Sequence, residues 1–79
     1  MKTMTCRQLG GACDKAFRAS SFTEIAEMSK QHGREMFLAR DGAHIQAMDE
    51  MKELMQNPST MAEWFENKRK EFEASPENT

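Results

Sequence analysis

Few of the features that mark common protein classes are present in this sequence. Its 79 residues include no tyrosine, one tryptophan, two prolines and two cysteines. No apolar run approaches the roughly 20 residues that a membrane-spanning helix needs, so we expect no membrane span. Neither sign of charge dominates, because 11 Lys and Arg residues stand against 13 Asp and Glu residues. This balance argues against a nucleic-acid binder.

Signatures of catalysis and export are also missing. No Ser/His/Asp order, paired-carboxylate motif or phosphate-cradling glycine loop rises above chance, so we expect a protein that is not an enzyme. Gly10-Gly11 is interpreted as a turn, because no helix is expected directly after it. Residues 1–6 lack the apolar segment of a signal peptide, which favours a cytoplasmic protein.

The length allows one small domain, which we place at residues 1–75, with a flexible polar tail at 76–79. The fold class expected is α+β, with a β-hairpin followed by three α-helices around one small core. The elements expected are a hairpin at about residues 3–18 and helices at about 22–40, 43–56 and 60–74.

The hairpin is predicted from the Gly10-Gly11 turn and the β-branched residues before it. We assume that Cys6 and Cys13 oppose each other across the turn. Every second residue along each strand then points to the same face of the hairpin. The inner face then holds Met4, Cys6, Cys13 and Phe17.

The first helix is predicted to begin at Ser21, because Ser21 and Glu24 have the spacing of a capping box. Gly33 in mid-helix indicates a close contact there, since glycine is costly in a helix. The Asp41-Gly42 pair is expected to break the helix. The apolar stripe takes positions three or four residues apart: Phe22, Ile25, Met28 or Ser29, His32 and Met36.

The two later helices are separated by Asn57-Pro58, and we expect Ser59 to cap the third. Their apolar stripes offer more surface than a small core needs, so we expect a homo-oligomer formed through both helices. These stripes contain Ile45, Met48, Met51, Leu54 and Met55, and then Met61, Trp64, Phe65 and Phe72. The basic run 68–70 is flanked by glutamates and is expected to be a solvated face rather than a nucleic-acid contact.

The residues able to form a compact soft-metal site are Cys6, Cys13 and His32, with His44 as a possible addition. Two thiolates from a hairpin and an imidazole from the next helix resemble a ββα zinc finger in layout, although the spacing differs. His32 is the histidine expected to face the hairpin. The sequence therefore predicts a site for zinc or another divalent metal at Cys6, Cys13 and His32.

Other interpretations of these residues stay open. A buried cysteine behaves as a small apolar residue, and a histidine on an apolar stripe is commonly a core residue hydrogen-bonded to the backbone. A Cys6–Cys13 disulfide is a further alternative, although a reducing cytoplasm disfavours it. A thiol redox protein is disfavoured because no Cys-x-x-Cys motif stands at a helix start. If the cysteines and the histidine are only core residues, the chain is a structural or protein-interaction module that self-associates through its Met-rich and aromatic helices.

Four segments of the first half of the chain together match a known pattern: residues 6–14 (CRQLGGACD), Phe17-Arg18-Ala19, Phe22-Thr23-Glu24-Ile25 and His32-Gly33. Through these segments, roughly residues 1–40 resemble the domain-of-unknown-function 1059 family, whose members are described as predicted small metal-binding proteins. The resemblance implies a hairpin packed on a helix, with Cys6, Cys13 and His32 as metal ligands.

The chain departs from the family pattern at Phe37, where many members carry a second histidine. A four-ligand site would then need its last ligand from elsewhere. His44, a carboxylate, water and a second subunit are the alternatives.

Overall fold

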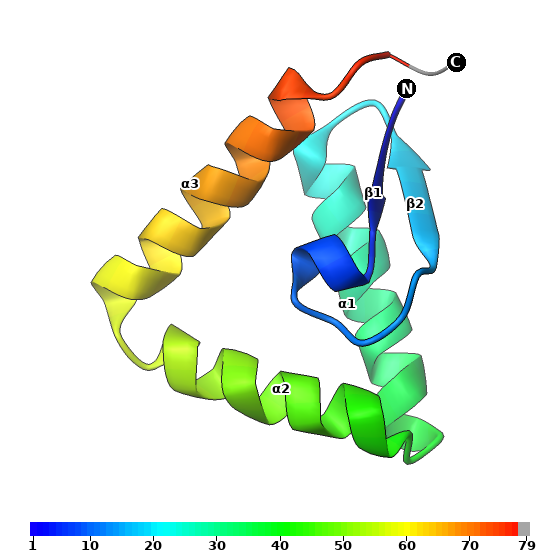
Figure 1. Cartoon of the computed structure of the whole chain (residues 1–79), viewed down its shortest axis with the longest axis vertical. Coiled ribbons are helices and arrows are strands. Elements are labelled where there is room, and N and C mark those ends of the chain that lie inside the picture. Colours follow the sequence, from blue (N-terminus) through cyan, green and yellow to red (C-terminus); the bar gives the residue numbers. More distant parts are fainter. Residues whose placement is uncertain (78–79) are drawn as a thin grey trace.

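The computed structural model describes residues 1–77 and confirms the α+β class. An antiparallel hairpin and three helices follow one another along the chain. In Figure 1 the helices form the three sides of a triangle, and the hairpin lies against α1. The molecule is flat, with principal extents of 33, 30 and 15 Å. The elements are β1 (Lys2–Thr5), the 3₁₀ helix η1 (Arg7–Leu9), β2 (Ala16–Ala19), α1 (Phe22–Leu38), α2 (Gly42–Met55) and α3 (Pro58–Ala74).

The core lies between the hairpin and α1. Met4 and Phe17 are opposite each other in the β1–β2 register, and both are buried, as the inner face of the predicted hairpin requires. Ile25 of α1 is fully buried beneath them. The buried apolar side chains of the described chain are Met4, Cys6, Leu9, Phe17, Ala19, Ile25 and Phe72.

The strands are shorter than expected, so neither cysteine lies in a strand. The backbone leaves the ladder after Thr5 because Thr5 and Gln8 exchange two hydrogen bonds. The Gln8 N–H donates to the Thr5 hydroxyl, and the Thr5 N–H donates to the Gln8 side-chain oxygen, as in a capping box. Gly10, at a φ of 89°, ends η1 in the left-handed region that favours glycine. The Gly10-Gly11 turn is therefore the end of η1, within the long loop 6–15.

Helix α1 begins as predicted and ends two residues early. The Ser21 hydroxyl accepts the Glu24 N–H and so caps the helix. At the other end Arg40 has a φ of 57°, and its N–H donates to the Phe37 carbonyl. The Asp41 N–H donates to the Met36 carbonyl, which completes a Schellman motif and turns the chain sharply into α2.

Helices α2 and α3 lie close to the expected bounds, but the cap of α3 was predicted wrongly. Asn57, not Ser59, is the N-cap, because its side-chain oxygen accepts the N–H groups of Ser59 and Thr60. Pro58 takes the first helical position, where its missing N–H costs nothing. The helix therefore begins two residues earlier than predicted.

The end of α3 returns to the start of the chain. The Phe72 ring packs 6.1 Å from the Phe22 ring, and the Lys2 ammonium lies 5.4 Å from the Phe72 ring centre. The amino group of Met1 pairs with Glu77. The flexible tail predicted at 76–79 includes residues 78 and 79, which lie outside the described residues.

The charged face of α3 has the ion pairs expected from its sequence. Arg69 pairs with Glu66 and Glu73, and Lys68 lies 3.1 Å from Glu71. No helix within residues 1–77 combines the length and the apolar character needed to cross a membrane.

Candidate metal centre

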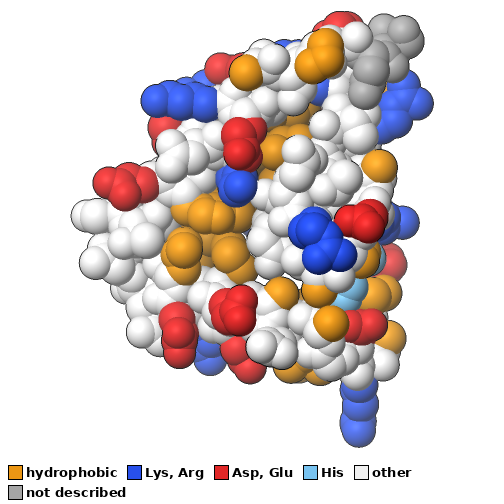
Figure 2. Space-filling model, in the orientation of Figure 1, with side chains coloured by type: hydrophobic (Ala, Val, Ile, Leu, Met, Phe, Trp, Pro, Cys, Tyr) orange, Lys and Arg blue, Asp and Glu red, His pale blue; other side chains and the backbone are white. Residues whose placement is uncertain are grey.

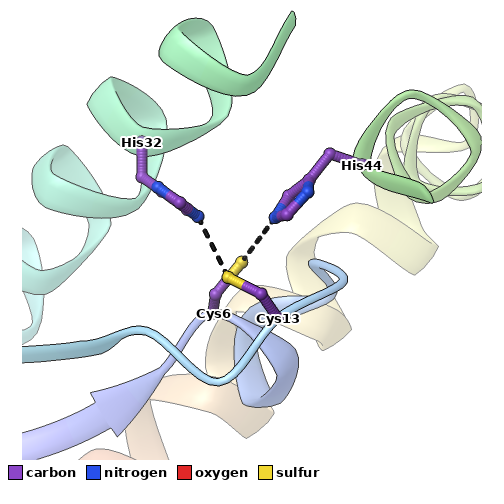
Figure 3. A group of neighbouring side chains, drawn as sticks. All are labelled: Cys6, Cys13, His32 and His44. Atoms are coloured by element: carbon purple, nitrogen blue, oxygen red, sulfur yellow. Dashed lines mark hydrogen bonds between the residues drawn. The ribbon is translucent and has the colours of Figure 1, made fainter. Parts of the chain in front are cut away.

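Both cysteines and both histidines of the chain meet at one place. The sulfur atoms of Cys6 and Cys13 and one ring nitrogen from each of His32 and His44 all lie within 4.8 Å of one another. Figure 3 shows the two thiols pointing up from the hairpin loop and the two rings pointing down from α1 and α2. Three separate parts of the fold therefore contribute to one cluster.

The loop 6–15 fixes the two thiols. The Cys6 N–H donates to the Lys15 carbonyl at 2.8 Å, and the Arg7 N–H donates to the Cys13 carbonyl at 2.9 Å. These bonds hold the two cysteines opposite each other just beyond the ends of the strands. Sequence reasoning predicted that they face each other, and the structure shows this through loop bonds rather than through the strand ladder.

Gly11 is required by the position of the Cys6 sulfur. A Cβ atom at Gly11 would lie 2.1 Å from that sulfur, far inside contact distance. The Gly11 N–H also donates to the Cys6 carbonyl at 2.8 Å, so the loop folds back directly over the thiol. Any side chain at this position would displace a member of the cluster.

His32 comes from α1 and reaches the half-buried thiol. Its Nε2 lies 3.3 Å from the Cys13 sulfur, and the residue is buried. Burial lowers the pKa of His32, and the nearby His44 adds to this effect. Both effects favour the neutral ring, which is the form that binds metals. The sequence-based placement of His32 is confirmed.

His44 comes from α2 and reaches the buried thiol. Its Nε2 lies 3.6 Å from the Cys6 sulfur, and it is the one buried residue of α2. The expectation that His32 alone faces the hairpin was wrong. The Schellman turn at Arg40 and Asp41 aims the start of α2 back at the loop, and this brings His44 to the cluster.

Asp41 orients the His44 ring. One carboxylate oxygen, Oδ1, accepts both the backbone N–H of His44 and its Nδ1–H, each at 3.0 Å. Because a carboxylate accepts only, Nδ1 carries the proton and Nε2 presents its lone pair to the cluster. The bond from Asp41 raises the pKa of His44, and the same bond lowers the pKa of Asp41. A carboxylate behind a histidine is the usual outer partner of a metal ligand.

The two thiols have different electrostatic surroundings. Burial raises the pKa of Cys6, a residue that is only 4% exposed. A hydrogen bond from the Lys15 backbone N–H lowers the pKa of Cys13, which is half-buried. Cys13 is therefore the easier of the two thiols to ionise.

The cluster fits a tetrahedral ion of zinc type. Metal–sulfur distances near 2.3 Å and metal–nitrogen distances near 2.0 Å set sulfur and nitrogen roughly 3.5 Å apart. The Cys13–His32 and Cys6–His44 distances, 3.3 and 3.6 Å, lie at this value. The other pairs lie within 4.8 Å and need to close by roughly 1.5 Å at most. Two thiolates also offset the charge of a divalent ion.

A cavity adjoins the cluster on one side. It measures about 280 Å³ and lies between the hairpin loop, α1 and α2. Its lining includes Cys6, His32 and His44 of the cluster and the side chains of Met48 and Met51.

The predicted ligands Cys6, Cys13 and His32 all lie in the cluster, and the structure adds His44 from the open alternatives. Asp41 was missed, although its position three residues before His44 is the spacing of an N-cap over a first-turn side chain. The Thr5–Gln8 pair was missed as well, although Thr-x-x-Gln is a capping-box pattern.

Comparison with known proteins yields no relative. No family model matches the chain, and neither a curated protein nor a solved structure matches it. The resemblance to the domain-of-unknown-function 1059 family stays a prediction that rests on residues 1–40.

Proposed function

We propose that this chain is a small, non-enzymatic metal-binding module that holds one divalent ion, zinc by preference. The observation that carries the proposal is the convergence of both cysteines and both histidines of the chain within 4.8 Å. A core that merely tolerated these residues would have no reason to collect all four. Both Nε2 atoms lie next to a sulfur, whereas a core histidine would be expected to bond to the backbone.

The donor set favours zinc and a closed site. Two thiolates and two imidazoles suit a tetrahedral ion of borderline softness, whereas carboxylates suit calcium and magnesium. A catalytic zinc keeps one position for water, but here four protein side chains complete the tetrahedron. This supports a binding or structural role rather than catalysis. We place the function in the cytoplasm, where the thiols would stay reduced.

Metal titration of the reduced, metal-free chain tests the proposal. Cobalt(II) should bind at one ion per chain, with a sulfur-to-cobalt charge-transfer band and the visible bands of a tetrahedral ion. Zinc should displace it. His32→Ala and His44→Ala should weaken binding by similar factors, because each ring faces one sulfur. Absence of the charge-transfer band, or an ion that binds equally well after both substitutions, would contradict the proposal.

Asp41 offers a matched control for ligand geometry. Asp41→Asn keeps a good N-cap side chain but removes the carboxylate behind His44, so zinc affinity should fall about 10–100-fold. Asp49→Asn makes the same chemical change at an exposed site on α2 and should leave affinity unchanged. Equal effects from both substitutions would mean that the loss reflects charge rather than support of His44.

We also propose, as a second role, self-association through α2 and α3. An apolar pocket of about 150 Å³ opens between the three helices, and Figure 2 shows apolar side chains gathered in this hollow. The side chains that line it include Leu9, Phe22, Met51, Met55, Trp64 and Phe65. Met61 and Phe65 are 37% and 38% exposed. Contact of this apolar surface with water is unfavourable, and burial against a second copy would remove it.

Sedimentation at micromolar concentration tests this second role. The wild-type chain should sediment as a homo-oligomer, and the double variant Met61→Ser, Phe65→Ser should sediment as a folded monomer. Far-UV circular dichroism on both samples checks that the helices remain. A wild-type chain that is monomeric at these concentrations would contradict the proposal.

A further inference from the structure

The two sulfur ligands share one loop, whereas the two nitrogen ligands come from different helices. Cys6 and Cys13 lie at the two ends of the turn inside the loop 6–15, and the bonds to Lys15 and from Arg7 hold them opposite each other. Their sulfur atoms lie within 4.8 Å. Closing them to a disulfide length of about 2.05 Å therefore needs side-chain rotation and a small loop movement, with no displacement of a helix.

The two thiols differ in access. Cys6 is 4% exposed and lies beneath Gly11, whereas Cys13 is half-buried at the edge of the cluster. A small oxidant from solvent therefore meets Cys13 first. Cys6 stands behind it in the position of a second thiol that completes a disulfide.

We propose that the centre is a redox-controlled metal site, in which a peroxide joins Cys6 to Cys13 and releases the ion. This inference rests on the proposed metal-binding function and names its regulation. A disulfide uses the two anionic ligands, so His32 and His44 alone remain. Two imidazoles on separate helices hold a divalent ion far more weakly than the complete set. Oxidation of one loop thereby empties a site built from three segments.

The chemistry balances with hydrogen peroxide as the oxidant. The Cys13 thiolate attacks one peroxide oxygen, the O–O bond breaks, and the departing hydroxide takes a proton to become water. The Cys6 thiolate then attacks the sulfenic sulfur of Cys13. The S–S bond forms, the S–O bond breaks, and a second water leaves after protonation by solvent. Two thiolates are oxidised by two electrons, one peroxide is reduced to two waters, and the divalent ion departs unchanged.

A thiol reductant reverses the change. A dithiol such as dithiothreitol attacks the disulfide, forms its own cyclic disulfide and returns both thiols to the loop. The hairpin bonds around the loop do not involve the sulfurs, so the reduced site can reform without refolding. The structure thus couples metal release to a reversible two-electron step.

The experiment uses the full chain loaded with one equivalent of zinc. Hydrogen peroxide is added in the presence of a chromogenic zinc chelator, and non-reducing peptide mapping follows the thiols. We expect one zinc released for each intramolecular Cys6–Cys13 disulfide formed, and zinc rebinding after dithiothreitol treatment and removal of the chelator. Zinc retained while both thiols stay reduced, or zinc released with only intermolecular disulfides, would overturn the inference.

Single-cysteine variants test the order of events. Cys6→Ser should accumulate a sulfenic acid at Cys13 that a dimedone probe traps, whereas Cys13→Ser should react several-fold more slowly at the buried Cys6. The reverse order would overturn the assignment of Cys13 as the attacked thiol. Failure of the reduced wild-type chain to bind zinc at the outset would contradict the proposed function itself, and is therefore distinguished from a failure of the redox step.

Discussion

The hairpin and α1 are built differently from α2 and α3. Most buried apolar side chains of the described chain come from the first region: Met4, Cys6, Leu9, Phe17, Ala19 and Ile25. The second region adds Phe72 at the end of α3, and the only buried residue of α2 is His44. One region therefore has a small apolar core, whereas the other is anchored at its start by a polar side chain.

This difference indicates what a metal would do for the fold. An imidazole taken out of water needs a partner for each nitrogen, and His44 has Asp41 on one side and the cluster on the other. A metal at the cluster would join α2 to the hairpin loop and α1. The first region is expected to fold around its own contacts, whereas the place of α2 should depend on the ion.

The largest effect is expected from removing core volume in the first region. Ile25→Ala should lower the free energy of unfolding by about 2–5 kcal/mol, because Ile25 is fully buried. Ile45→Ala removes the same atoms from a half-buried position on α2 and should cost clearly less. Urea denaturation of the two zinc-loaded variants measures both. Equal losses would mean that the two regions share one core.

Metal removal should affect α2 more than the hairpin. A ligand present at 1,000 times its Kd stabilises the folded state by about 4 kcal/mol, and this contribution disappears with a chelator. Amide hydrogen exchange should therefore speed up most in α2, whereas β1 and β2 keep more of their protection. Uniform acceleration along the chain would show that the ion supports the whole fold rather than the position of α2.

The two histidines should titrate on opposite sides of the ordinary value in the metal-free chain. NMR should find the pKa of His44 above about 6.5 and that of His32 below it, because Asp41 holds the His44 proton and burial opposes charge on His32. Asp41→Asn should lower the pKa of His44 and change that of His32 less, because Asp41 acts on His32 only through His44. Equal pKa values in the unaltered chain would contradict this electrostatic account.

The same pKa shifts have opposite consequences for stability. The folded state binds the His44 proton more tightly than the unfolded chain does. His44 therefore contributes fully to the free energy of unfolding below about pH 6.5, and this contribution is lost as the pH rises through its raised pKa. His32 has a lowered pKa, so its neutral form supports folding above about pH 6.5, and acid removes that support. Comparing the pH dependence of unfolding for His32→Ala and His44→Ala separates the two contributions.

The smallest effect concerns Gly33, where sequence reasoning expected a close contact. A Cβ atom there would lie 3.6 Å from the Met48 methyl group, which is ordinary packing. Gly33→Ala should therefore stabilise α1 by about 0.5–1 kcal/mol, measured by thermal unfolding. Gly11→Ala is the matched contrast, because its added Cβ collides with the Cys6 sulfur and should weaken zinc binding. Destabilisation by Gly33→Ala would instead support the close contact at Gly33 that the sequence predicts.

The fold was predictable where local signals agree. The Ser21 cap, the apolar stripe through Ile25 and the break between α2 and α3 just before Pro58 each follow from short-range rules. The helix bounds lie within about two residues of the prediction. The opposition of Cys6 and Cys13 followed from hairpin geometry, although the loop between them is longer than a simple turn.

The fourth member of the cluster was less accessible to sequence reasoning. His44 is one position away from the apolar stripe that begins at Ile45, so periodicity placed it off the buried face. Its place depends on the direction in which α2 leaves α1, and that direction is fixed by Arg40 in the left-handed region. Glycine or asparagine usually marks such a turn, and an arginine gives no sequence signal for it.

The most direct test of the central claim is X-ray absorption at the zinc edge of the purified, zinc-loaded chain. We expect two sulfur neighbours at about 2.3 Å and two nitrogen neighbours at about 2.0–2.1 Å, with one zinc per chain. A first shell of nitrogen and oxygen alone would contradict the assignment of Cys6, Cys13, His32 and His44 as the four ligands.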